Sequence, residues 1–253
     1  MDLQLTGSRV LVTGGTRGIG RAIVEAFVDE GAVVEFCARD AGEIEETEKG
    51  LAARAGRASG VRLDVRDGPA LTGWVEEAAG RLGGLDAVVA NVSAIAVPDT
   101  EENWYTSFEV DLMHTVRLVR SALPHLEASG RGSIVAISSV SGREADFASG
   151  PYGTMKTALV GYLSGLALQL APRGVRANVV SPGNTYFENG FWQGAETGSP
   201  DLFTMALGLN PTGRMGTPEE MAKAVVFLSS PVSSFTTGTN LVVDGALTRG
   251  IQL

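Results

Sequence analysis

Short apolar runs alternate with longer stretches in which apolar and polar positions follow a helical period. Runs such as Val10–Val12 and Ala87–Ala90 are unbroken, which is typical of parallel strands covered on both faces. Strands that alternate with helices predict right-handed crossovers and an α/β fold, a doubly wound parallel seven-stranded sheet with helices on both faces. The predicted strands span residues 10–12, 32–36, 59–63, 87–90, 133–137, 177–180 and 240–243, and the predicted helices span 21–28, 43–54, 71–81, 108–126, 152–169 and 218–228.

A glycine-rich stretch, Thr13–Gly20, lies between the first strand and the first helix. Glycines allow backbone N–H groups to approach phosphate oxygens, and the start of a helix supplies partial positive charge. A tight structural turn is the alternative, but the strand–turn–helix context favours a dinucleotide site. Ligands of such sheets bind outside the carboxyl ends of the strands, where further site residues are expected.

Composition narrows the possible partners. The net charge of −9 argues against nucleic acid and anionic membranes, because binding to phosphate groups needs a basic surface. One cysteine and two histidines exclude an internal disulfide framework and make a metal site improbable. The N-terminus lacks the pattern of a signal peptide, and no apolar run reaches the ~20 residues of a membrane span, so a cytoplasmic protein is expected.

The end of the second strand indicates which nicotinamide dinucleotide binds. Enzymes that use NAD place an acid there for the ribose hydroxyls, whereas enzymes that use NADP offer Arg to the extra phosphate. The acid position falls on Ala38 and is followed by Arg39, while Arg17 in the glycine turn is a second cation. Glu35 lies too early in the strand and Asp40 lies past the turn. The pattern favours NADP(H) over NAD(H), with ordinary surface arginines as the alternative.

Candidate catalytic residues follow the fifth strand. Tyr152 and Lys156 are four residues apart on a predicted helix and therefore share a face, and Ser139 follows the buried strand before them. Lowering the pKa of a tyrosine from about 10 to about 7 requires ~4 kcal/mol. An ammonium at ~4 Å supplies about that much at an effective dielectric constant near 20. Tyr152 is therefore predicted to move a proton while Ser139 positions a carbonyl oxygen.

Over essentially its whole length the chain resembles the short-chain dehydrogenase/reductase family, including members such as 3-oxoacyl-carrier-protein reductases. The resemblance rests on Thr13–Gly20, Asp64-Val65, Ser139, Tyr152, Lys156, Asn178, Pro182-Gly183 and Val243–Gly245. It implies a single Rossmann domain over residues 1–253, NAD(P)-dependent carbonyl or alcohol chemistry, and a homotetramer or homodimer. The implied cofactor contacts are Gly14, Thr16, Arg17, Gly18, Ile19, Arg39, Asp64, Val65, Asn91, Tyr152, Lys156, Pro182, Gly183 and Thr185.

Two positions depart from the family pattern. After the fourth strand the family usually has Asn-Asn-Ala-Gly, whereas this chain has Ala90–Ser93. The family's fourth catalytic residue, an Asn that holds a relay water through its backbone carbonyl, corresponds to Asp111. Asp111 keeps the carbonyl, but its carboxylate is expected to offset part of the field of Lys156 on Tyr152.

The resemblance places the substrate loop at about residues 183–215, before the last helix. The family's carboxamide-binding Thr is replaced there by Phe187, so Thr185 or a backbone group is expected to take its place. The aromatic residues of this loop predict a lid over a bulky, apolar substrate, with Gly190, Gly194 and Gly198 allowing it to open; a local core or a subunit contact is the alternative. The expected substrate contacts are Ser139, Ser141, Glu144, Phe147, Tyr186, Phe187, Phe191 and Trp192.

The sequence therefore predicts an NADP(H)-dependent ketone reductase that also works as an alcohol dehydrogenase on a small molecule. The proposed catalytic residues are Ser139, Tyr152, Lys156 and Asp111. A non-catalytic dinucleotide-binding relative is the alternative from another class. A 3-oxoacyl group on an acidic carrier protein is the alternative substrate, with Arg131 and Arg173 as candidate docking residues.

Overall fold

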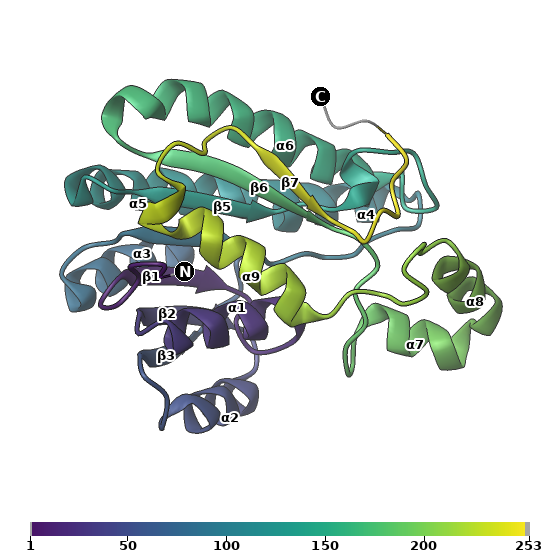
Figure 1. Cartoon of the computed structure of the whole chain (residues 1–253), viewed down its shortest axis with the longest axis horizontal. Helices are drawn as coiled ribbons and strands as arrows, with labels where there is room; N and C mark the ends of the chain where they lie inside the picture. The colour runs from purple at the N-terminus through teal and green to yellow at the C-terminus, as the bar shows by residue number, and fades with distance from the viewer. Residues whose placement is uncertain (1, 251–253) are drawn as a thin grey trace.

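The computed structural model describes residues 2–250, which contain one seven-stranded sheet in the order β3-β2-β1-β4-β5-β6-β7 (Figure 1). Every neighbouring pair of strands is parallel, which confirms the predicted fold class. The strands are β1 Arg9–Thr13, β2 Val33–Ala38, β3 Arg57–Arg62, β4 Ala87–Ala90, β5 Ser133–Ile137, β6 Arg176–Pro182 and β7 Asn240–Val243.

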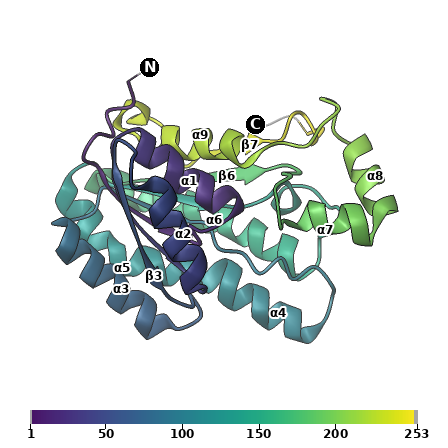
Figure 2. The ribbon, with the colours of Figure 1, turned by 90° about the horizontal axis from the view of Figure 1, so that it is seen from below.

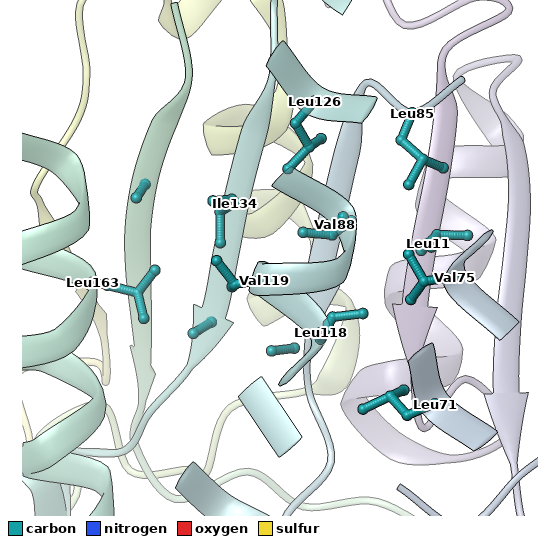
Figure 3. Close-up of a cluster of buried hydrophobic side chains, with 14 of the residues drawn as sticks. Leu11, Leu71, Val75, Leu85, Val88, Leu118, Val119, Leu126, Ile134 and Leu163 are labelled. Carbon is teal, nitrogen blue, oxygen red and sulfur yellow. The ribbon is translucent and has the colours of Figure 1, made fainter. Parts of the chain in front are cut away.

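Helices cover both faces of the sheet (Figure 2). One face packs against α1 (Gly18–Asp29), α2 (Ala41–Leu51) and α9 (Pro218–Ser229), and the other against α3 (Gly68–Leu82), α5 (His114–Ser129) and α6 (Pro151–Leu170). Figure 3 shows side chains of the strands packing against leucines and valines of the second group of helices, α3, α5 and α6. Because the strands are apolar toward both layers, the sheet is the rigid centre on which the loops are mounted. The labelled side chains are Leu11, Leu71, Val75, Leu85, Val88, Leu118, Val119, Leu126, Ile134 and Leu163.

The helix expected at residues 108–126 differs from the prediction. The structure has α4 (Glu101–Ser107), a π-helical turn (Phe108–Met113) and then α5. A π-helical turn adds one residue to a helical repeat and redirects the side chains around it. The hydrophobic period of the sequence does not distinguish such a turn from a continuous α-helix, so the turn was not predicted. Asp111 lies within this turn.

The segment expected as a loop, residues 183–215, contains two helices, α7 (Phe191–Gly198) and α8 (Pro200–Gly208). They form a hairpin beside the carboxyl ends of the strands, apart from the two main layers (Figure 1). The hairpin has its own apolar cluster around Trp192 and Ala206. Gly194 and Gly198 lie within α7, so they are helical residues and not loop hinges.

Glu35 is held away from the cofactor end of the sheet. It is 3% exposed on β2 and accepts two hydrogen bonds from Arg81 of α3, at 2.9 and 2.7 Å. A buried carboxylate needs such a partner, since removing its hydration costs several kcal/mol.

Replacing Arg81→Ala is expected to lower the free energy of unfolding by about 2 to 3 kcal/mol, because it leaves the Glu35 carboxylate buried and unpaired. Denaturant unfolding followed by circular dichroism measures the change. Lys49→Ala is the matched control, since Lys49 pairs with Glu45 on the exposed face of α2. Equal losses in the two variants would contradict the structural role of the Glu35–Arg81 pair.

Candidate active site

A cavity of about 990 Å³ lies at the carboxyl ends of the strands and under the α7–α8 hairpin. It brings together most of the residues expected from the sequence. Three of them do not line it: Gly18 lies beneath Phe187, Asp111 lies behind Lys156, and Tyr186 faces the hairpin. The expected residues on its wall are Gly14, Thr16, Arg17, Ile19, Arg39, Asp64, Val65, Asn91, Ser139, Ser141, Glu144, Phe147, Tyr152, Lys156, Pro182, Gly183, Thr185, Phe187, Phe191 and Trp192.

The glycine turn is locked to the end of β4. Gly14 has φ +72°, and a Cβ there would lie 2.9 Å from Val92. The Asn91 amide donates to the carbonyl oxygens of Thr13 and Gly14, at 3.1 Å each. A Cβ on Gly20 would lie 1.9 Å from the Gly14 oxygen. These contacts fix a turn whose form suits a bound pyrophosphate.

The two arginines expected beside the ribose of the cofactor, Arg17 and Arg39, both lie on the cavity wall. Both are exposed, and within residues 2–250 neither forms an ion pair. Of the nearby acids, Glu35 pairs with Arg81, and Asp40 accepts from the Glu43 N–H at the start of α2 through Oδ1. Asp40 itself also lies on the cavity wall.

Two other cofactor-side residues make contacts that the sequence did not reveal. The Thr16 hydroxyl donates to the Glu43 carboxylate at 2.7 Å, which adds an acid to the cavity wall. The Asp64 carboxylate accepts from the side chain and backbone N–H of Arg66, and the guanidinium hydrogen bond lowers the pKa of Asp64. Asp64 therefore lines the cavity as one half of an ion pair.

The candidate catalytic residues meet where β5 ends and α6 begins. The Ser139 side chain lies beside Tyr152, and the Lys156 Nζ lies 5.6 Å from the centre of the Tyr152 ring. Lys156 is 2% exposed and donates to the Ile137 carbonyl at 3.0 Å. The Ser138 hydroxyl donates to the Lys156 carbonyl at 2.8 Å, which fastens the helix to the strand.

Burial raises the pKa of Tyr152 above its ordinary value, and this effect outweighs the others. The Lys156 ammonium and the neighbouring Ser139 hydroxyl act in the opposite direction, while the carboxylates of Asp111 and Asp146 raise the pKa further. The sequence analysis expected Lys156 to be sufficient to lower the pKa of Tyr152 toward neutral pH. In this structure the field of Lys156 alone does not do so, because burial has the larger effect. The positive ring of an oxidised nicotinamide would act in the same direction as Lys156.

The two departures from the family pattern touch each other. The Asp111 Oδ1 lies 3.2 Å from the Lys156 Nζ and 2.5 Å from the Ser93 Oγ. Asp111 is fully buried, and its Oδ2 has no hydrogen-bond partner within the described part of the chain. The expectation that this carboxylate lies close enough to offset Lys156 therefore has a direct geometric basis.

The sequence analysis missed a buried histidine, His114. It connects the π-helical turn that carries Asp111 to the start of the glycine turn. Burial lowers the pKa of His114 to about 4, so its ring is neutral at neutral pH. Its Nδ1 bonds the Val110 carbonyl, which only accepts, so Nδ1 carries the proton. Its Nε2 then accepts from the Thr13 hydroxyl at 3.3 Å, and the Thr13 oxygen accepts from the Asn91 N–H at 3.0 Å. A lone histidine in a helical period gave no signal of this link.

Three aromatic rings line the substrate side of the cavity. Phe191 and Trp192 at the start of α7 have ring centres 5.0 Å apart, and both lie beside Phe147, at 6.5 and 5.9 Å. They join the hairpin to the loop between β5 and α6. An apolar wall of this kind suits the flat or cyclic part of a substrate.

The other two aromatic residues have different roles. The Tyr186 ring packs against Phe203, and its hydroxyl donates to Glu196 at 2.6 Å, so its assignment to the substrate wall is wrong. Tyr186 belongs to the hairpin's own core, which was the alternative considered. The Phe187 ring lies over the glycine turn, 2.6 Å from where a Cβ of Gly18 would be. It contacts the cofactor side of the cavity.

Polar contacts organise the opposite wall. The Ser141 hydroxyl donates to Asp146 at 2.6 Å, so it is engaged within its own loop. The Glu144 carboxylate accepts from the Gly250 N–H at 3.1 Å and ties this loop to the C-terminal segment. Residues 247–249 of that segment also line the cavity, a contribution that the sequence analysis did not anticipate.

The parallel sheet, the glycine turn and the Ser–Tyr–Lys group define an NAD(P)-dependent oxidoreductase. Residues 14–248 match the family model described as "Enoyl-(Acyl carrier protein) reductase". The chain belongs to the short-chain dehydrogenase/reductase family, as its motifs indicated.

Similar proteins cover the whole chain. It is 40% identical to isoepoxydon dehydrogenase patN of Aspergillus clavatus, with 98% of each protein covered. It is 38% identical to L-fucose dehydrogenase of Mus musculus, over 98% of this chain and 90% of that protein. A solved structure of a Serratia marcescens short-chain dehydrogenase/reductase mutant matches with a TM-score of 0.88 and 30% identity, over 96% of this chain and 98% of that chain.

Within residues 2–250, the helices are too short or too polar to cross a membrane. The same residues contain no group of three or more His, Cys, Asp or Glu side chains placed to hold a metal ion.

Replacing Asp111→Asn is expected to lower the pKa of Tyr152, because it removes a negative charge that raises it. Alcohol oxidation needs the phenolate, so the rate rises with pH through the pKa of Tyr152. The midpoint should move about one pH unit toward acid, equivalent to ~1.4 kcal/mol. The dependence of kcat on pH measures it, and an unchanged or more alkaline midpoint would contradict the electrostatic role of Asp111.

Proposed function

We propose that the protein is an NADP(H)-dependent oxidoreductase that interconverts a ketone and a secondary alcohol on a ring-bearing, largely apolar small molecule. The observation that carries the proposal is the grouping of Tyr152 with Ser139 and Lys156 on the wall of a cavity that begins at the glycine turn. The nicotinamide group would supply or accept the hydride. The protein side chains bind, orient and move the proton.

The proposed mechanism uses each member of this group. The Ser139 hydroxyl donates to the substrate carbonyl oxygen and fixes its position. Tyr152 gives its proton to the same oxygen as the carbon gains hydride, and the phenolate takes the proton back in the oxidation direction. Lys156 stabilises the phenolate, and Asp111 acts as a modified member of the proton relay through its contact with Lys156.

Preference for NADP(H) is supported by Arg17 and Arg39 on the cavity wall. A guanidinium binds a phosphate through paired, charge-assisted hydrogen bonds. The acid that would hold a ribose diol in an NAD enzyme is absent from the position at Ala38. Glu35 is engaged in an ion pair, and Asp40 caps the start of α2 through Oδ1. Glu43, the remaining acid of this region, is bonded to Thr16.

The substrate class is supported by the wall of Phe147, Phe191 and Trp192. Met205 and Leu209, beyond the aromatic rings, extend the apolar surface. Two relatives are named for isoepoxydon and for L-fucose, and both names indicate small molecules as substrates. A small cyclic substrate with few charges fits this wall.

A carrier-bound 3-oxoacyl substrate is not favoured. Arg131 pairs with Asp86, and Arg173 pairs with Glu127, so neither is a free cation for an acidic carrier. Arg131 comes just before β5, and Arg173 comes just before β6. Both therefore lie at the amino ends of the strands, whereas the cavity lies at the carboxyl ends. Their pairing and their distance from the cavity therefore give no support to a docking site there.

The proposal is tested by assaying a panel of cyclic and linear ketones with NADPH and with NADH. We expect cyclic ketones with NADPH to be reduced fastest. Tyr152→Phe should lose more than about 1,000-fold in kcat while its fluorescence titration with NADPH stays the same, because the phenol moves the proton and the cofactor is held mainly by other residues. Wild-type protein that binds NADPH and reduces none of the panel would favour the non-catalytic alternative.

Replacing Arg39→Ala or Arg17→Ala is expected to lower kcat/KM for NADPH about tenfold each, the value of one charge-assisted contact. The value for NADH should stay within about twofold of wild type. Steady-state kinetics with both cofactors measure this. Arg54→Ala is the control, because Arg54 pairs with Asp29 away from the cavity. Equal losses with NADPH and NADH would refute the phosphate-binding role.

A further inference from the structure

A chain of hydrogen bonds runs from the substrate wall of the cavity to the buried ammonium. The Ile95 N–H donates to the Ser93 Oγ at 3.3 Å, and the Ser93 hydroxyl donates to the Asp111 Oδ1 at 2.5 Å. The same Oδ1 contacts the Lys156 Nζ at 3.2 Å. Because the Ile95 N–H already uses a lone pair of the Ser93 oxygen, the hydroxyl proton is free to point at the carboxylate.

Each step of this chain is constrained by its surroundings. Ile95 lines the cavity with φ +49°, a conformation that is uncommon for a β-branched residue. Asp111 is fully buried, and among residues 2–250 its Oδ2 has no partner, so the hydrogen bonds of its side chain there fall on Oδ1. A carboxylate in such a site is held strongly by each donor that reaches it.

We propose that Ser93 is a positioning residue that acts through Asp111. Its hydroxyl keeps the carboxylate at one distance from Lys156 and takes up part of its negative charge, so that more of the ammonium's field reaches Tyr152. Ser93 and Asp111 therefore act as a pair in place of the family's Gly and Asn at these positions. This role rests on the proposed proton transfer by Tyr152.

Other charged groups face the pair from the neighbouring elements. His114 on α5 becomes charged only below about pH 4, since burial lowers its pKa to about that value. Arg117 on α5 is paired with Glu109 of the π-helical turn. On the side of the β5–α6 loop, Asp146 is the further carboxylate that raises the pKa of Tyr152, and it is held by Ser141.

The test is a double-mutant cycle of Ser93→Ala and Asp111→Asn. The readout is the ionisation of Tyr152, measured as ultraviolet difference absorbance between each protein and the same protein with Tyr152→Phe. Ser93→Ala alone should move the Tyr152 midpoint about half to one pH unit toward alkali, the effect of one hydrogen bond on an ionisation. In the Asp111→Asn background the same change should move it by less than about 0.2 unit, because the carboxylate that Ser93 acts on is gone.

Ser93→Thr keeps the hydroxyl and should restore the wild-type midpoint, which separates a lost hydrogen bond from general loosening of the loop. Equal shifts in both backgrounds, or no shift in either, would overturn the proposal. The titration needs no turnover, so it judges Ser93 even if the ketone panel shows no activity. Where the enzyme is active, kcat for alcohol oxidation at neutral pH should fall about three- to tenfold in Ser93→Ala, as expected for a shift of half to one unit, while KM for NADP⁺ stays unchanged.

Discussion

The active site is built around one costly requirement, the burial of the Lys156 ammonium at the end of β5. An amine that is 2% exposed loses its hydration and must find partners within the protein. The Ile137 carbonyl supplies one and the Asp111 carboxylate supplies the charge. Asp111 reaches this place because a π-helical turn displaces it from an ordinary helical position. The π-helical turn thus brings a charged partner to the buried Lys156 ammonium.

Neutralising the cation and activating the phenol are opposed aims. A carboxylate beside Lys156 stabilises the folded chain, but it also raises the pKa of Tyr152. A family Asn would avoid this conflict because an amide carries no charge. In this chain the Ser93 hydroxyl donates to the same Asp111 oxygen that contacts Lys156. This hydrogen bond keeps the Asp111 carboxylate at a fixed distance from the ammonium. The balance between stability and reactivity thus depends on the geometry of one hydroxyl group.

The parts of the structure that follow a simple period could be predicted from the sequence. Short, largely apolar runs located the seven strands to within two residues at either end, and the four-residue spacing of Tyr152 and Lys156 placed both on one face of α6. The contact of Ser93 with Asp111 could not be predicted, because it joins residues that are distant in sequence through an irregular turn. The orientation of Tyr186 was missed because an aromatic residue near a site suits a local core as well as a substrate wall.

The substrate side is less predictable because it does not depend on the sheet. The α7–α8 hairpin has its own apolar cluster and reaches the cavity mainly through Phe191 and Trp192. Substitutions in this cluster can reshape the wall while leaving the packing that holds Tyr152 and Lys156 intact. The loop wall is likewise tied to the C-terminal segment through Glu144 and Gly250. The hairpin and the loop wall thus shape the cavity through residues other than Ser139, Tyr152 and Lys156, so its substrate side can vary while those three stay in place.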